Sequence, residues 1–170
     1  MAEQAYPTLN GEAQSWANIT AVADLYDGPS IDLGEIGIKS LKWDVGLEVG
    51  AQRNTKGEIV KFTRGQATPS SSIGFYADGI WTFVEKLIDI AIAKGYVDAG
   101  VAKYGRVRFG IVVLHTPEGT TGIRKVTLEG CRLKKDVGDH GEGTDADESE
   151  HELVITRVVR EINGKKGALL

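Results

Sequence analysis

Residues 78–95 read DGIWTFVEKLIDIAIAKG, the one long helical pattern in the chain. Apolar side chains recur there at the three- and four-residue spacing of one helix face. They are Ile80, Phe83, Val84, Leu87, Ile88 and Ala91. Asp78 is suited to accept hydrogen bonds at the helix start, and Gly95 to adopt the left-handed conformation that ends a helix. We predict an amphipathic helix from about Asp78 to Lys94, whose apolar face either joins the core or docks on a partner subunit.

The patterns on either side of this helix are those of β-strands. From Ser40 to Val49 apolar and polar residues alternate, which predicts a strand with one buried and one solvated face. Further strands are predicted at 17–25, 59–62, 72–76, 106–115, 123–133 and 153–162, with a break at 64–69. About seven strands and one helix favour a mainly β fold, a two-sheet sandwich or barrel with one flanking α-helix.

The 170 residues are interpreted as a single domain with three polar appendages. Residues 1–16 lack a sustained period and are predicted to form an N-terminal arm. Residues 50–58 form the polar, flexible tip of a long hairpin, and 135–150 form an exposed acidic loop. A short tail is expected to start at Asn163.

Composition excludes several classes of protein. A formal net charge of −4 argues against general affinity for nucleic acid, which requires a basic surface. The sequence contains neither a long apolar run nor a basic leader, so we expect no membrane association and a protein that stays in the cytoplasm where it is made. Cys131 is the single cysteine and is expected to be a small buried apolar group.

The sequence offers weak candidates for chemistry. His140 and His151 flank the acidic segment, but their spacing does not match a zinc site, and the carboxylates fail the calcium-loop pattern at its sixth and twelfth positions. A solvated charged loop is the simpler interpretation. No phosphate-binding glycine loop or nucleophile motif is present. We therefore predict no catalytic residues, no metal, no cofactor and no enzymatic activity.

The ordered features resemble a known family, the tail tube proteins of contractile-tailed bacteriophages, whose fold is shared by the inner tubes of type VI secretion systems. The resemblance covers most of the chain from about Ile31. It is carried by DLGEIGIKSLKWDVGLEVG (32–50), GAQRNTKGEIVKF (50–62), DGIWTFVEKLIDIA (78–91) and KVTLEGCRLKKDVGDHGEGTDADESEHELVITRVVREINGKKG (125–167). It implies a structural virion protein of the viral tail, assembled in the host cytoplasm by stacking of homo-hexameric rings.

The same resemblance implies partners and surfaces. Sheath and baseplate proteins are the expected partners, and DNA passes through the lumen during ejection without specific binding. We predict that Lys42, Asp44 and Glu48 line the channel, with Lys42 and Lys61 as departures from a purely acidic wall. The alternative is that this face meets water or the sheath on the outside of the tube. Because the hairpin tip is longer than a turn requires, Gln52, Arg53, Asn54, Thr55 and Lys56 are predicted to contact an adjacent ring.

Two other interpretations remain open. A baseplate or tail-completion protein of the same fold is the nearer alternative. A small β-barrel binding module is the more distant one, since it would need a concave site with converging polar groups.

Overall fold

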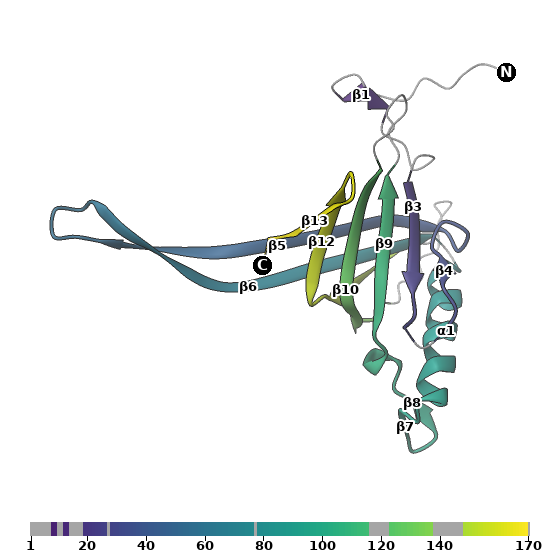
Figure 1. The fold of residues 1–170 in the computed structure, drawn as a ribbon. Helices are drawn as coiled ribbons and strands as arrows, with labels where there is room; N and C mark the ends of the chain where they lie inside the picture. The colour runs from purple at the N-terminus through teal and green to yellow at the C-terminus, as the bar shows by residue number, and fades with distance from the viewer. Residues whose placement is uncertain are drawn as a thin grey trace.

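The computed structural model describes residues 8–9, 12–13, 19–26, 28–76, 78–115, 123–137 and 148–169 as a mainly β fold with one α-helix (Figure 1). Nine of the described strands form one hydrogen-bonded sheet. They are β3 (Ile19–Asp24), β4 (Ile31–Asp32), β5 (Ile38–Arg53), β6 (Ile59–Tyr76), β9 (Phe109–His115), β10 (Arg124–Lys135), β11 (Glu148–Val154), β12 (Arg157–Ile162) and β13 (Lys165–Ala168). The predicted fold class is confirmed.

Shorter elements surround this sheet. Two small ribbons pair β1 (Thr8–Leu9) with β2 (Glu12–Ala13) and β7 (Val97–Asp98) with β8 (Val101–Ala102). A 3-10 turn, η2 (Tyr104–Arg106), precedes β9. The helix is α1 (Gly79–Ala93). Most of the predicted arm at 1–16, and residues 138–147 of the predicted acidic loop, lie outside the described residues.

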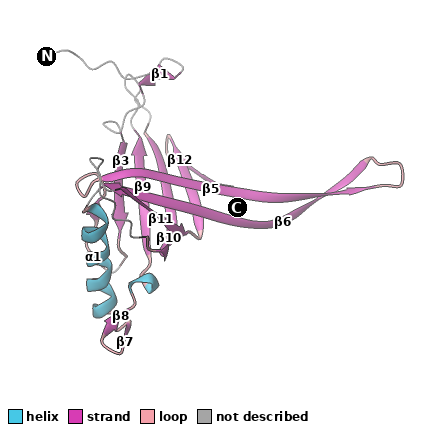
Figure 2. Ribbon diagram, turned by 180° about the vertical axis from the view of Figure 1, so that it is seen from behind, coloured by secondary structure: helices cyan, strands magenta, loops and turns pink. Residues whose placement is uncertain are grey.

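Strand β10 joins the two layers of the sheet. Its first half, Arg124 to Glu129, pairs with β12, and its second half, from Arg132, pairs with β11. The strand changes partner at Gly130, whose φ of +66° is a conformation that glycine adopts at little cost. The layer containing β5 and β6 therefore runs across the layer containing β9, β10 and β12 (Figure 2).

This bend corrects the prediction of one strand over 153–162. The segment is two strands, β11 and β12, interrupted at Ile155 and Thr156. The Thr156 N–H donates to the Glu129 carbonyl at 2.8 Å, so the chain turns where β10 bends. A side chain at Gly130 would collide with Thr156.

Helix α1 packs where the layers meet. The Phe83 ring lies 5.5 Å from that of Phe75 on β6 and 5.4 Å from that of Phe109 on β9, measured between centroids. Gly95 ends the helix with φ +73°, as predicted. Asp78 precedes the helix, but its side chain makes no capping hydrogen bond, so that detail is wrong. Its φ of −80° and ψ of −1° are helical, whereas a capping side chain needs an extended backbone.

Strands β5 and β6 form an antiparallel hairpin that extends far beyond the rest of the fold (Figure 1). The predicted break at 64–69 is wrong, because β6 runs continuously through it. Pro69 pairs with Val45 of β5, while β11 reaches only as far as Ser70. Proline fits at this point because β6 has only one described neighbour there and needs no second set of hydrogen bonds.

The predicted C-terminal tail is also a strand. Asn163 and Gly164 have φ values of +51° and +78°, the geometry of a two-residue hairpin turn. They join β12 to β13, with Ile162 opposite Lys165.

Candidate functional site

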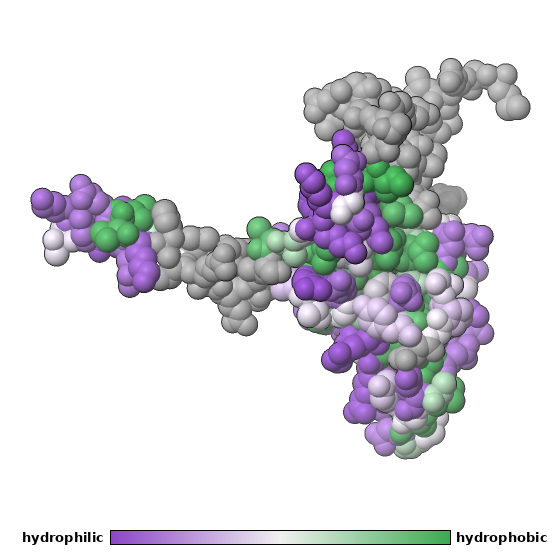
Figure 3. All heavy atoms as spheres, in the orientation of Figure 1, coloured by the Kyte–Doolittle hydropathy of each residue, from purple (hydrophilic) through white to green (hydrophobic). Residues whose placement is uncertain are grey.

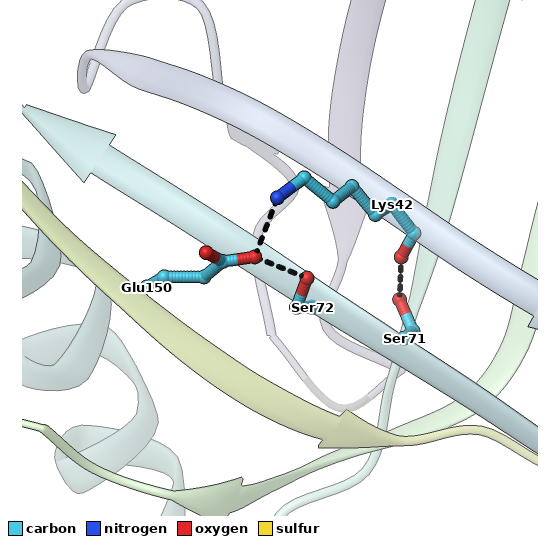
Figure 4. Close-up of polar contacts among 4 residues, drawn as sticks. All are labelled: Lys42, Ser71, Ser72 and Glu150. Atoms are coloured by element: carbon cyan, nitrogen blue, oxygen red, sulfur yellow. Dashed lines mark hydrogen bonds and ion pairs between the residues drawn. The ribbon is translucent and has the colours of Figure 1, made fainter.

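One face of the β5–β6–β11 layer carries a cluster of charged and hydroxyl side chains. The Lys42 ammonium lies 3.0 Å from the Glu150 carboxylate, and the Ser72 hydroxyl donates to the same carboxylate oxygen at 2.7 Å (Figure 4). Both hydrogen bonds lower the pKa of Glu150, and the one from Ser72 has the larger effect. Behind them, the Ser71 hydroxyl donates to the Lys42 carbonyl at 2.7 Å.

A second ion pair lies on the neighbouring strands. Lys134 of β10 is 3.0 Å from Glu152 of β11, and the hydrogen bond from Lys134 lowers the pKa of Glu152. A hollow of about 420 Å³ separates the two pairs. It is lined by Lys42, Trp43, Asp44, Ser70, Ser71, Ser72, Lys134, Glu152 and Leu153. We call this face the polar wall, meaning Lys42, Asp44, Ser70, Ser72, Lys134, Glu150 and Glu152.

The structure brings two of the three predicted channel residues to the polar wall. Lys42 and Asp44 are both exposed on β5. Glu48 also lies in β5, but the register shifts between Leu47 and Val49, so simple alternation does not assign its face. Its side chain lies outside the described residues. A lining role in a channel stays a prediction for all three.

Two further carboxylates of this wall, Glu150 and Glu152, were missed because 135–150 was interpreted as a loop and the following strand was predicted to begin only at 153. Glu148–Glu150 in fact begin strand β11. The signal was present in the alternation of ESEHELV, residues 148–154, in which Ser149, His151 and Leu153 are more buried than Glu150 and Glu152. The concentration of acidic residues hid this two-residue period.

The predicted contact residues occupy the far end of the hairpin. Gln52 and Arg53 belong to β5 and are followed by a compact turn at Asn54, Thr55 and Lys56. The Asn54 carboxamide oxygen accepts from the N–H groups of Lys56 and Glu58 at 2.9 and 3.0 Å. The Arg53 guanidinium donates to the Gly57 carbonyl at 2.9 Å. A compact turn held by these hydrogen bonds therefore ends the long hairpin whose tip was predicted over 50–58.

His151 is fully buried on β11, and no role in the core was predicted for it. Its Nδ1 accepts from the Val137 N–H at 3.2 Å and lies 3.4 Å from the Asp136 carboxylate, while its Nε2 contacts the Ser149 hydroxyl at 2.9 Å. Burial lowers the pKa of His151 and outweighs the opposing charge of Asp136. Tyr104 donates to Asp136, and this hydrogen bond, together with burial and the charge of Asp136, raises the pKa of Tyr104 to about 12.

The described residues give no support to a metal site. Within them, no three His, Cys, Asp or Glu side chains gather in a way that could hold an ion. His140 lies outside the described residues. Cys131 is buried, as predicted, and burial raises the pKa of its thiol to about 12. In the described part of the chain, no helix has the length and apolar character needed to cross a membrane.

Comparison with known proteins finds structures that are similar to this one at low sequence identity. No protein-family model matches the chain, and no curated protein matches it. A chain in the sheath/tube terminator of the PVC extracellular contractile injection system is similar with TM-score 0.56 and 11% identity, over 94% of this chain and 99% of that one. A chain in the six-fold symmetrised baseplate of the anti-feeding prophage gives TM-score 0.56 and 14% identity, over 95% and 97%.

A third similar chain belongs to the PVC sheath–tube complex in the extended state, with TM-score 0.54 and 10% identity over 94% of this chain and 93% of that one. At these identities the comparisons show a shared fold. The predicted resemblance to tube proteins is therefore confirmed at the level of fold. Terminator and baseplate structures contain this fold too, so the fold does not single out the tail tube.

Proposed function

We propose that this chain is a structural, non-enzymatic subunit that forms rings on the tube axis of a contractile phage tail or a related injection system. One observation carries the proposal. The similarity to components of such particles extends over nearly the whole of this chain and of the similar chains. A partial match would fit an insertion or a shared motif, whereas a match of this extent fits a subunit of the same architecture.

An open edge of the sheet supports assembly with other chains. Strand β5 is the edge of its layer, with β6 as its one described neighbour. Long exposed edges are sites of pairing with other chains. A two-stranded hairpin is marginally stable by itself in water, so the β5–β6 extension needs a neighbour to cover it. Figure 3 shows mostly hydrophilic side chains at its far end with a hydrophobic patch beside them, where Ile59 and Val60 are exposed.

The position that we propose is at an end of the tube, in a terminator or baseplate ring. Two of the three structures described above are a sheath/tube terminator and a baseplate. The repeating tail tube is the second candidate, favoured by the similarity to the sheath–tube complex. Six copies in a ring would fit the six-fold symmetry of the similar baseplate.

In either position we propose that the polar wall faces the channel. Its described charges are two lysines, Lys42 and Lys134, against the three carboxylates of Asp44, Glu150 and Glu152. Both lysines are ion-paired across strands, and Lys39 and Lys135 also lie near enough to act on Glu150 and Glu152, so acidic and basic charges nearly balance on this face. A surface with balanced charge does not hold phosphate, as passage of DNA requires.

Analytical ultracentrifugation of the purified chain over a range of concentrations tests this proposal. We expect a species of six times the 18.3-kDa chain mass that stops growing as concentration rises, as a terminal ring should. Open-ended growth into tubes would favour the repeating tube instead. A monomer at every concentration would contradict both positions.

A further inference from the structure

Helix α1 carries a second apolar stripe on the side that faces away from the core. Trp81 and Ile92 are 65% and 57% exposed, and Ile88 between them is half-buried. Their i, i+7 and i+11 spacing places them on one face of the helix. Glu85 and Asp89 are exposed along one border of this stripe. An exposed tryptophan in an apolar patch with a charged border is typical of a protein–protein contact.

A groove of about 870 Å³ lies between β5 and the C-terminal β12–β13 hairpin. Its walls are mainly apolar, and Ile162 and Leu169 are 54% and 61% exposed there. The apolar lining consists of Trp43, Val45, Val158, Ile162, Ala168 and Leu169. The charged lining consists of Arg160, Lys165, Lys166 and Asp44, so basic groups predominate.

The stripe and the groove belong to opposite lateral ends of the fold. The layer runs in the order β4, β3, β9, β10, β12, β13, with α1 beside the β3–β4 end (Figure 1). A contact between two different surfaces at opposite ends of a subunit is heterologous. Repeating this contact generates a closed ring when the rotation between neighbouring copies adds up to a full turn.

We propose that the α1 stripe of one copy docks in the β5/β12–β13 groove of the next copy, and that this contact closes the ring. The inference rests on the proposed ring-forming function and adds to it the surfaces in contact. Complementary charge selects a second copy of this chain as the occupant. Acidic Glu85 and Asp89 border the apolar stripe, and basic Arg160, Lys165 and Lys166 border the apolar groove. Trp81 is the anchor, since large aromatic side chains contribute most to such contacts.

The first test replaces the apolar anchors with Trp81→Ser and Ile92→Ser together. The concentration needed for ring formation should rise roughly ten-fold or more. Val101→Ser is the matched control, because Val101 is 61% exposed on the β7–β8 ribbon, belongs to neither docking surface and should leave ring formation unchanged. The single variant Trp81→Phe keeps an aromatic side chain at the anchor position and should still form rings. This result separates loss of the contact from loss of folding. Normal ring formation by the variant with Trp81→Ser and Ile92→Ser would overturn the docking proposal while leaving the proposed function intact.

A charge exchange tests the pairing itself. Glu85→Lys with Asp89→Lys should weaken rings, as should Lys165→Glu with Lys166→Glu, and all four changes in one chain should restore them. No recovery in the four-fold variant would contradict the pairing. A wild-type monomer would overturn the proposed function together with the docking proposal.

Discussion

Lys42 and Glu150 are 108 residues apart in sequence, yet the ammonium of one lies 3.0 Å from the carboxylate of the other. The pair connects β5 to β11 across β6 and places a lysine beside an acidic group at the centre of the polar wall. Both side chains are more than half exposed, at 67% and 52%. Exposed pairs of this kind stabilise a fold by about 0.2 to 1 kcal/mol. Their main effect here is on the charge of the wall.

Lys42→Met should therefore change stability little. We expect the free energy of unfolding in urea to fall by less than about 1 kcal/mol, because the pair is screened by water and Ser72 still binds Glu150. Glu150→Gln is the matched control and should have an effect of similar size. A loss several times larger from Lys42→Met would mean that the pair is a main determinant of the fold.

The charge of the polar wall should affect passage through the channel. Asp44→Lys with Glu48→Lys removes two negative charges and adds two positive charges in each subunit, and these changes sum around a ring where screening is incomplete. We expect particles that assemble normally and deliver DNA poorly. Glu35→Lys with Asp98→Lys makes the same change in charge at other sites and is the control. Normal delivery by the Asp44/Glu48 variant would contradict the lumen assignment.

Acidification should destabilise the fold through His151. Burial lowers the pKa of His151 in the folded state below its ordinary value of 6.5. Below that pH the unfolded chain therefore binds a proton at His151 more readily than the folded chain does. Stability should fall from about pH 7 towards pH 5, by at most about 1.4 kcal/mol per pH unit. Glu150 and Glu152 have pKa values below 4.5, so their contributions are lost at lower pH.

Urea unfolding of the wild type and of His151→Gln over pH 5 to 7 measures this slope. The glutamine variant should be less stable at pH 7 and should have a flatter profile, because it keeps a side-chain amide but has no titrating ring. Equal slopes for the two proteins would show that another group controls acid stability.

The helix and the central strands could be predicted from sequence because their signals are local. The spacing of α1 and the glycine at its end depend on neighbours in the chain, as does the alternation along β5. The bend of β10 could not be predicted in this way. It depends on Gly130 meeting Thr156. The continuity of β6 through Pro69 depends on where the distant strand β11 ends.

Only part of the polar wall could be predicted from sequence, because only part of it depends on local signals. Lys42 and Asp44 follow from the alternation of one strand. Glu150 and Glu152 were hidden among other acidic residues, and their place beside Lys42 and Lys134 depends on pairing between strands far apart in sequence. His151 shows the same limit, since a histidine between two glutamates looks solvated until β11 is placed against the core.

The tip of the β5–β6 hairpin should contribute to contacts between rings. Replacing Asn54–Glu58 with Asn-Gly keeps a hairpin turn and removes Thr55 and Lys56 with the tip hydrogen bonds. We expect single rings to form normally and their binding to an adjacent ring of the particle to become weaker and more salt-sensitive, as measured by co-sedimentation of rings with tubes or baseplates. Unchanged binding would contradict the contact role of Gln52 to Lys56.

Negative-stain imaging of the purified chain tests ring formation most directly. Class averages should show six-fold rings with a central opening, either single or stacked. Uniform monomers at high concentration, with no rings after a tube or baseplate seed is added, would contradict the assignment to the tube axis.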